Sequence, residues 1–132
     1  MIENWLAIAV GGALGAVLRA SLHQLLTGTV FGPSRSSRPL TPALATLLAN
    51  ALGCLLLGIW LAGFPWDGFE HPPWLHPLMM MGLCGGLTTF STLCADAARL
   101  KRERGLTGAL LYLGLTVASG ILFFAVGARW SL

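Results

Sequence analysis

No other property of this sequence limits its fold as much as its long uncharged stretches. Three runs contain no Asp, Glu, Lys or Arg: residues 39–66, 71–95 and 105–128. A helix needs about 20 predominantly apolar residues to cross the hydrocarbon core of a bilayer, and each run can supply that length. A fourth apolar stretch, residues 5–26, carries Arg19 as its only charge. The sequence therefore predicts an all-α membrane protein.

We expect four transmembrane helices that together form a single domain over residues 1–132, at about 5–26, 42–63, 75–98 and 106–128. The composition agrees, because 55% of the residues are hydrophobic, 10% are charged and the mean hydropathy is +0.75. Such helices leave almost no chain outside the bilayer for a soluble catalytic domain. No nucleophile and base pair, phosphate loop or metal-ligand set is recognisable, so we predict transport, conduction or membrane assembly and not an enzyme. The cysteines Cys54, Cys84 and Cys94 form no CxxC pair, and we interpret them as small buried side chains.

Basic residues are distributed unevenly among the predicted connections. With four helices, connections 32–42 and 99–105 share one side of the membrane, and both termini share the other side with connection 64–74. The second side carries only Arg129, whereas the first carries Arg35, Arg38, Arg99, Lys101, Arg102 and Arg104. The positive-inside rule predicts a multi-pass protein of the cell (inner) membrane, with connections 32–42 and 99–105 in the cytoplasm. The net charge of +3 is thus a topology signal, and no nucleic-acid partner is expected.

The segment GLCGGLTTFSTLCAD, residues 82–96, interrupts the apolar pattern of the third predicted helix. Gly85 and Gly86 supply backbone flexibility, and hydroxyl groups follow at Thr88, Thr89, Ser91 and Thr92. Backbone that leaves helical geometry inside a bilayer persists only where protein or a polar cavity satisfies it, and unwound segments form ion sites in transporters. The spacings Gly82xxxGly86 and Gly11xxxGly15 also fit a motif for close helix packing. Both interpretations stay open at this point.

Residues 85–92, GGLTTFST, resemble the signature of the Fluc/CrcB family of fluoride-specific ion channels. GGALGAVLR at 11–19 and ATLLANALGCLLLG at 45–58 follow the same family pattern. The resemblance implies passive export of fluoride from the cytoplasm, which lowers fluoride toxicity. It also implies an antiparallel dimer with a third helix broken near its middle. A structural sodium ion, not transported, would lie at the dimer centre on the main-chain carbonyls of Gly85 and Thr88.

The same resemblance implies a fluoride pathway. Phe90 matches a pore-lining aromatic, whose ring edge carries partial positive charge. Asn50, an amide within an apolar span, either donates to fluoride or bonds a neighbouring helix. Tyr112 and Thr116 match family positions on the fourth helix, and Ser119 shares their helix face. Arg19 matches the first-helix arginine, which we interpret as a structural or pore-mouth charge. The expected pathway therefore comprises Asn50, Phe90, Ser91, Thr92, Tyr112, Thr116 and Ser119.

The sequence departs from the family pattern at three positions. Leu93 replaces a second Phe, Asp96 replaces a Glu, and Gly120 stands where a second hydroxyl is expected, with Ser119 one position away. A homodimer with two orientations also needs balanced Lys and Arg, which this chain lacks. The expected partners are therefore fluoride, membrane lipid and a second subunit in the opposite orientation, either the same chain or a paralogue that supplies the missing Phe.

Two other functions remain open. A small four-span multidrug or cation exporter is also an antiparallel dimer, but it binds cations on a carboxylate within the membrane. Here Glu3 precedes the first span and Asp96 ends the third, so neither acid lies near a predicted midplane. A non-conducting membrane assembly subunit would explain the small-residue packing motifs, but it leaves the hydroxyl cluster and Asn50 without a role.

Overall fold

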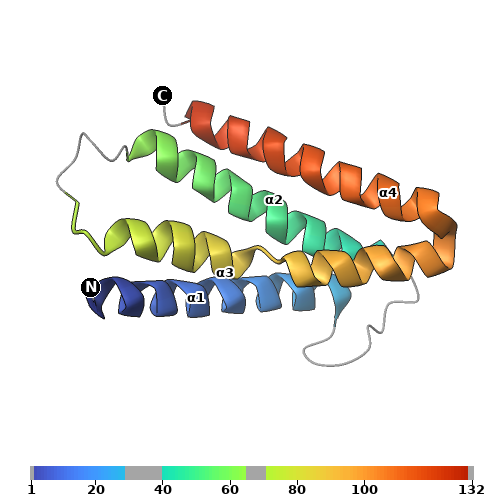
Figure 1. The fold of residues 1–132 in the computed structure, drawn as a ribbon, viewed down its shortest axis with the longest axis horizontal. Coiled ribbons are helices and arrows are strands. Elements are labelled where there is room, and N and C mark those ends of the chain that lie inside the picture. Colours follow the sequence, from blue (N-terminus) through green and yellow to red (C-terminus); the bar gives the residue numbers. More distant parts are fainter. Residues whose placement is uncertain (1, 29–39, 65–70, 131–132) are drawn as a thin grey trace.

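The computed structural model describes residues 2–28, 40–64 and 71–130. Helix α1 covers Ile2–Thr27 and α2 covers Leu40–Gly63. A π-helical segment, η1, covers Pro77–Cys84 and continues into the short helix α3, Gly85–Leu87, and α4 covers Phe90–Trp130. No strand occurs within these ranges, which confirms the predicted all-α class. Figure 1 shows the helices running side by side along one long axis.

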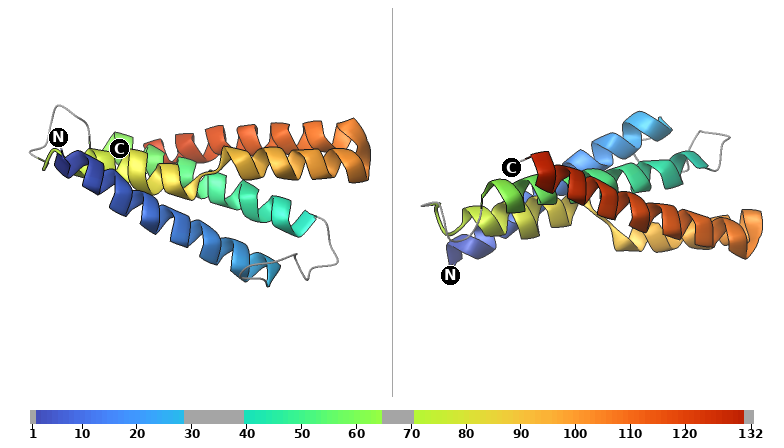
Figure 2. Two further views of the ribbon diagram at one scale, coloured as in Figure 1. Left: turned by 60° about the horizontal axis from the view of Figure 1, so that its bottom comes forward. Right: turned by 90° about the horizontal axis from the view of Figure 1, so that it is seen from above.

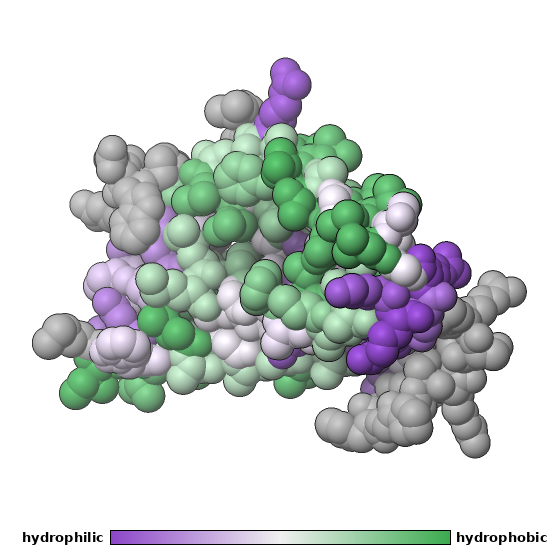
Figure 3. All heavy atoms as spheres, turned by 45° about the vertical axis from the view of Figure 1, so that its right-hand side comes forward, coloured by the Kyte–Doolittle hydropathy of each residue, from purple (hydrophilic) through white to green (hydrophobic). Residues whose placement is uncertain are grey.

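Three helical stretches are long and apolar enough to cross a membrane: Ile2–Thr27, Pro42–Gly63 and Pro77–Trp130. Large apolar side chains are exposed along α1 and α4, including Leu14 at 52% and Ile121 at 67%. The face drawn in Figure 3 is mostly apolar, and its hydrophilic residues gather mainly near the edges. An apolar surface of this extent is unfavourable in water and suits a lipid environment. The fold therefore agrees with the predicted membrane protein.

Helix α4 contains a reversal at Gly105, where φ is 75° and ψ is −177°. The chain is helical up to Arg104 and turns back at this point to run beside α2 (Figure 1). The helix therefore extends beyond its predicted end near residue 98, and the reversal lies at the last residue of the predicted connection 99–105. Its residues are good helix formers apart from glycine, and a positive φ has little steric cost only for glycine. Lys101, Arg102 and Arg104 are exposed beside this turn.

Glycines bring α1 into backbone contact with η1 and α3. A Cβ atom on Gly11 would overlap the carbonyl oxygen of Leu78, and one on Gly82 would lie 2.8 Å from the Cα of Gly11. A Cβ on Gly86 would lie 3.0 Å from the Cα of Gly12. These distances are shorter than carbon atoms normally approach without a bond, so the spacings Gly11xxxGly15 and Gly82xxxGly86 serve close packing. This contact fixes α1 against the segment that precedes residue 88.

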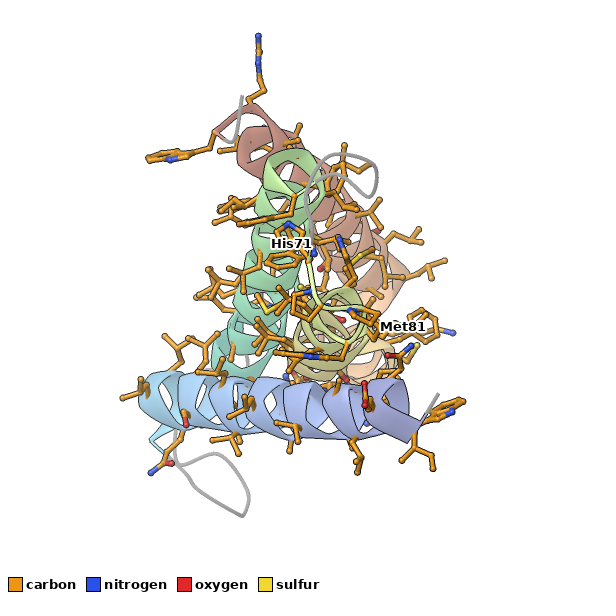
Figure 4. The ribbon with its side chains drawn as sticks, turned by 90° about the vertical axis from the view of Figure 1, so that its left-hand side faces the viewer. His71 and Met81 are labelled. Carbon is orange, nitrogen blue, oxygen red and sulfur yellow. The ribbon has the colours of Figure 1, made fainter. Side chains whose placement is uncertain are left out.

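The two ends of the bundle hold different packed clusters. Beside the Gly105 turn, a buried apolar cluster contains Ala43, Leu93, Ala97, Leu100 and Tyr112. At the opposite end, the indole Nε1 of Trp60 donates a 3.0 Å hydrogen bond to Nδ1 of His76. Figure 4, viewed along the bundle, shows His71 on the side of η1 toward α2 and Met81 on the outward side. These clusters hold α2 against its neighbours on both sides of the central region.

Candidate functional site

Helical geometry stops at Leu87 and resumes at Phe90, so Thr88 and Thr89 form an interruption between α3 and α4. Thr88 is extended, with φ −79° and ψ 155°, although its N–H still donates 3.0 Å to the carbonyl of Cys84. Figure 2 shows this non-helical link from two sides. Gly85 is helical, with φ −65° and ψ −37°. The chain therefore leaves helical geometry at Thr88 and Thr89, after Gly85 and Gly86 and not at the glycines themselves.

The side-chain amide of Asn50 both accepts a hydrogen bond from the main chain of Thr89 and donates one to it. Its Oδ1 accepts from Thr89 N at 2.8 Å, and its Nδ2 donates to Thr89 O at 3.4 Å. These bonds satisfy polar groups that the interruption frees, which an apolar environment would otherwise penalise by several kcal/mol. The amide nitrogen has a second hydrogen, so one donor remains beyond this contact. Asn50 therefore bonds the interruption that follows α3 and has one further N–H beyond this contact.

Arg19 reaches the interruption from α1. Its Nη1 donates a 3.2 Å hydrogen bond to the carbonyl oxygen of Thr88, 69 positions later in the sequence. Arg19 is half-buried. A fixed guanidinium at this point satisfies a carbonyl that has left helical geometry and adds a positive charge beside it. The structure thus brings Arg19, Asn50, Thr88 and Thr89 together.

Hydroxyl groups organise the start of α4. The Oγ1 of Thr89 lies 3.0 Å from Oγ1 of Thr92 and 3.2 Å from Oγ of Ser91. Thr92 N also donates to Thr89 Oγ1 at 3.3 Å. This is the geometry of an N-cap residue, whose side chain accepts from a main-chain N–H of the first turn. Thr89 therefore both ends the interruption and starts the next helix.

Two cavities flank the interruption. The larger, of about 640 Å³, lies between α2, η1 and α4, and its lining includes Asn50, Thr88, Phe90 and Thr116. Phe90 is 78% exposed in the single chain. The smaller, of about 230 Å³, is lined by three alanines and by polar side chains from α1, α2, the interruption and the start of α4: Arg19, His23, Thr46, Thr89 and Thr92. The smaller cavity thus offers positive charge and hydroxyl donors, and the larger is mainly apolar.

The hydroxyls expected along the fourth helix are not gathered into one row. Oγ1 of Thr116 donates to the carbonyl of Tyr112 at 2.9 Å, and Oγ of Ser119 donates to the carbonyl of Thr116 at 2.9 Å. Thr116 lines the larger cavity, whereas Tyr112 lies in the apolar cluster and Ser119 lines neither cavity. Leu93, the departure from the family pattern, lies in this apolar cluster and also borders the larger cavity.

A buried polar network beside the smaller cavity went unnoticed in the sequence. Thr46 donates 2.7 Å to Oδ2 of Asp96, and Arg99 donates 3.0 Å to Oδ1 of the same carboxylate. Asp96 is only 6% exposed, so both partners are needed to offset its desolvation. The Tyr112 hydroxyl is buried near Thr46 and Asp96, without a hydrogen bond of normal geometry to any described residue. Thr46 lies four positions before Asn50, so their shared helix face was a usable signal.

Metal binding by side chains of the usual kind has no basis in the described part of the chain. No group of three or more His, Cys, Asp or Glu residues is placed to hold an ion there. Main-chain carbonyl oxygens at the interruption are an alternative source of metal ligands. In a continuous helix the N–H of Thr89 would bond the carbonyl of Gly85, but it is donated to Asn50 instead. The carbonyls of Gly85 and Thr88 offer the oxygen ligands that a hard cation prefers. The Thr88 carbonyl, however, already accepts a hydrogen bond from Arg19.

Fold and site together define an all-helical membrane protein whose polar groups gather at an interruption between two cavities. A family model described as CrcB-like protein, Camphor Resistance (CrcB), matches residues 6–128. The chain belongs to this CrcB family, which confirms the resemblance inferred from residues 85–92.

Several relatives carry the name of a channel. The protein named Fluoride-specific ion channel FluC of Pseudomonas putida (strain W619) is 35% identical over 127 residues, which cover 96% of this chain and 92% of the relative. Fluoride-specific ion channel FluC 2 of Bacillus subtilis (strain 168) is 40% identical over 121 residues, with 92% and 82% covered. Fluoride-specific ion channel FluC 2 of Rhodococcus jostii (strain RHA1) is 35% identical over 124 residues, with 94% and 95% covered.

Proposed function

We propose that this protein is a passive, fluoride-selective channel that carries fluoride out of the cytoplasm and lowers its toxicity, and that it is not an enzyme. The names of its relatives support fluoride as the permeant ion. The observation that carries the proposal is the Thr88–Thr89 interruption, held by Asn50 and Arg19 between two cavities. Fluoride is small and strongly hydrated, so a path for it must replace part of its water with fixed donors.

The two cavities suggest an order of steps for the ion. The smaller cavity receives fluoride, because Arg19 and the hydroxyls of Thr89 and Thr92 attract an anion. The ion then passes the remaining N–H of Asn50 and the positive edge of the Phe90 ring in the larger cavity. Thr116, which lines the larger cavity, stays a candidate donor along this path. Ser91, Tyr112 and Ser119 line neither cavity and are proposed to contribute only outside them. Arg19 is already bound to the Thr88 carbonyl, which reduces the risk that it traps the anion.

We propose four membrane crossings, which the length of the third apolar stretch supports. Pro77–Trp130 has 54 residues, about 80 Å of helix at 1.5 Å per residue, whereas one crossing needs about 30 Å. The reversal at Gly105 therefore divides it into two crossings, the first of which contains the interruption. With the exposed basic residues Lys101, Arg102 and Arg104 at this turn, we place the turn in the cytoplasm of an inner-membrane protein. Arg35 and Arg38, on which the same topology rests, lie outside the described residues.

A second subunit in the opposite orientation completes the site. Phe90 and Gly85 are exposed beside the larger cavity, and an inverted copy covers both and closes the cavity. Two carbonyl oxygens per chain are too few for a sodium ion, but two copies double that number. These carbonyls would hold the sodium ion, which would supply a positive charge between the two subunits and would not be transported. The Arg19 guanidinium bonds the Thr88 carbonyl and would repel a second cation there. Carbonyls from both chains are therefore needed to offset this repulsion.

The partner is either the same chain or a paralogue. The basic residues favour one orientation of this chain, and Leu93 removes an aromatic edge that the family pattern contains. A paralogue with the opposite charge bias would account for both facts. Insertion of this chain in both orientations at equal levels would support the homodimer instead.

Growth in fluoride tests the proposed function in cells. We expect the chain to restore growth of a bacterial strain that lacks its own fluoride exporter, and to lower the fluoride content of the cells. The control is Asn50→Asp, which keeps the acceptor for Thr89 N–H and removes the donor. Resistance to organic cations without a change in cellular fluoride would favour a multidrug exporter. Correct membrane insertion with neither effect would favour an assembly subunit or a missing partner, and co-expression with a paralogue separates these two.

A further inference from the structure

The proposed function leaves several cysteine and histidine side chains without a role. Cys94 is exposed on α4 in the single chain, and is not the buried side chain expected from the sequence. His71 and His76 pack against Trp60 and line neither cavity. His23 differs from them, because it lines the smaller cavity. It therefore lies where fluoride is proposed to enter.

Thr27, one turn after His23 on α1, holds one edge of the imidazole ring. Its Oγ1 donates a 2.7 Å hydrogen bond to the main-chain carbonyl of His23 and lies 3.4 Å from Nδ1 of the same residue. A hydroxyl has one hydrogen, and the carbonyl, which can only accept, takes it. Toward Nδ1 the hydroxyl can therefore only accept, so Nδ1 carries a ring hydrogen. In the neutral ring this leaves Nε2 as the acceptor.

The Nε2 edge of the ring is the one that remains for the cavity. Thr27 is buried and does not line the cavity, so the Nδ1 edge is turned toward a residue outside it. An unprotonated Nε2 presents a lone pair, which repels an anion, whereas a protonated Nε2 presents a donor on a positively charged ring. Histidine changes between these forms at about pH 5–8. The affinity of the cavity for an anion therefore depends on the protonation of His23.

Arg19 and His23 are the charged or titratable side chains among the described residues that line this cavity. They are four positions apart on α1, so their Cβ atoms lie about 5–6 Å apart on one helix face. α2, the interruption and the start of α4 contribute only alanines and threonines. The Asp96 carboxylate on α4 lies beyond Thr46 and is already bonded by Thr46 and Arg99. An anion in the cavity would offset the repulsion between the two cations of α1.

We propose that His23 takes up a proton at Nε2 when fluoride enters the smaller cavity, and so supplies a second positive charge beside Arg19 that binds the ion there. The proton comes from water, no other bond forms or breaks, and fluoride stays an anion. The inference rests on the proposed function, which makes fluoride the anion that enters. Fluoride binding and protonation are reciprocal, so protonation strengthens fluoride binding by the same factor by which fluoride favours protonation. The fluoride flux therefore rises as the pH falls through the range in which histidine titrates.

Nitrogen-15 NMR of the imidazole rings in the purified full chain tests the protonation. At about pH 8, above the usual range of histidine, the His23 signals should show a neutral ring with its hydrogen on Nδ1. Sodium fluoride added at constant pH, within that range, should increase the protonated fraction of His23, with sodium chloride as the control. The signals of His71 and His76 should not change. A neutral ring with its hydrogen on Nε2, or a protonated fraction that fluoride leaves unchanged, would overturn the proposal.

Two substitutions of His23 separate its charge from its capacity to donate a hydrogen bond. His23→Gln keeps a donor and is neutral at every pH, whereas His23→Lys stays positively charged. With fluoride below saturation, flux from liposomes of the unchanged chain should be at least about fivefold higher at about pH 5.5 than at about pH 7.5. His23→Gln should stay near the lower value and His23→Lys near the higher value at both pH values. The same pH dependence in His23→Gln as in the unchanged chain would overturn the proposal.

The flux measurement needs two controls. Hydrogen fluoride forms at low pH and crosses lipid, so the rate in protein-free liposomes at each pH is subtracted. His71→Gln makes the same substitution at a histidine that lines neither cavity, and it should keep the pH dependence. Absence of fluoride flux from the unchanged chain at both pH values would count against the proposed function. The NMR measurement would then still decide the role of His23, because fluoride can enter a cavity without crossing the protein.

Discussion

Arg19 of α1 donates a 3.2 Å hydrogen bond to the carbonyl oxygen of Thr88, so a cation from the first helix is fixed at the interruption between α3 and α4. Arg19 also lines the smaller cavity, so its positive charge makes the electrostatic potential there more positive. Arg19 thus has two roles that substitutions can separate. One is structural, because Arg19 satisfies a main-chain carbonyl. The other belongs to the proposed function and is electrostatic, because a fixed cation would attract an anion.

Substitution of Arg19 by Lys keeps the charge and loses the planar guanidinium that reaches Thr88. We expect Arg19→Lys to retain part of the fluoride flux, whereas Arg19→Gln abolishes most of it. Hydrogen bonds to charged groups contribute about 1.5–3 kcal/mol, so both variants should also unfold more easily in detergent by a comparable amount. Arg129→Gln, at the other end of the chain, is the control. Full flux in Arg19→Gln would contradict the electrostatic role.

Substitutions of Asn50 can separate its role in holding the interruption from its proposed role as a donor to fluoride. Asn50→Ala leaves the N–H and carbonyl of Thr89 without their partner, and we expect a loss of about 1–3 kcal/mol in unfolding free energy. Asn50→Asp keeps the acceptor for Thr89 N–H but removes the donor and adds a negative charge. It should therefore fold better than Asn50→Ala and conduct no fluoride. Thermal unfolding measures the stability of each variant, and fluoride flux from liposomes measures its conduction on the same samples. Fluoride flux through Asn50→Asp would exclude the donor role.

Gly11 and Gly12 provide a matched pair for the packing of α1. A Cβ on Gly11 would overlap the backbone of η1, whereas one on Gly12 would meet nothing within 4 Å. Gly11→Ala should destabilise the protein by about 1–3 kcal/mol. Gly12→Ala should stabilise it by up to about 1 kcal/mol, because alanine favours helix more than glycine does. Equal melting temperatures for the two variants would contradict the close contact of α1 with η1.

The buried carboxylate of Asp96 depends on Thr46 for one of its hydrogen bonds. Thr46→Val has nearly the same shape but no hydroxyl, so the carboxylate keeps only Arg99 as a described partner. We expect a loss of about 1–3 kcal/mol in stability, and Thr46→Ser should recover most of it. Denaturant titration in detergent measures both. A larger loss for serine than for valine would show that the methyl packing of Thr46 matters more than its hydroxyl.

Much of the fold follows from the sequence because apolar length and glycine spacing act locally. The helix α1, Ile2–Thr27, closely matches the predicted 5–26, and the Gly11xxxGly15 motif packs as its spacing indicates. The helix end near residue 98 could not be placed correctly, because charged residues from Arg99 to Arg104 continue a helix as readily as they form a loop. Only the positive φ of Gly105 ends it.

The candidate site was harder to predict, because its contacts join residues far apart in the sequence. The motif at 85–92 indicated an interruption but put the flexibility at Gly85 and Gly86, whereas Thr88 and Thr89 leave the helix. Asn50 was recognised as a costly polar group, yet its two bonds to Thr89 depend on how α2 packs. The Thr46 and Asp96 contact, 50 positions apart, gave no local signal beyond the helix face that Thr46 shares with Asn50.

Fluoride efflux from liposomes that contain only this chain, followed with a fluoride electrode and with chloride as the control anion, tests the central claim most directly. Sodium buffer is compared with sodium-free buffer, because removal of a structural ion should weaken the dimer and lower the flux. We predict rapid fluoride efflux without chloride efflux, and its loss in Asn50→Asp. Equal efflux of both anions, or fluoride efflux that Asn50→Asp leaves unchanged, would contradict a selective path at the Thr88–Thr89 interruption.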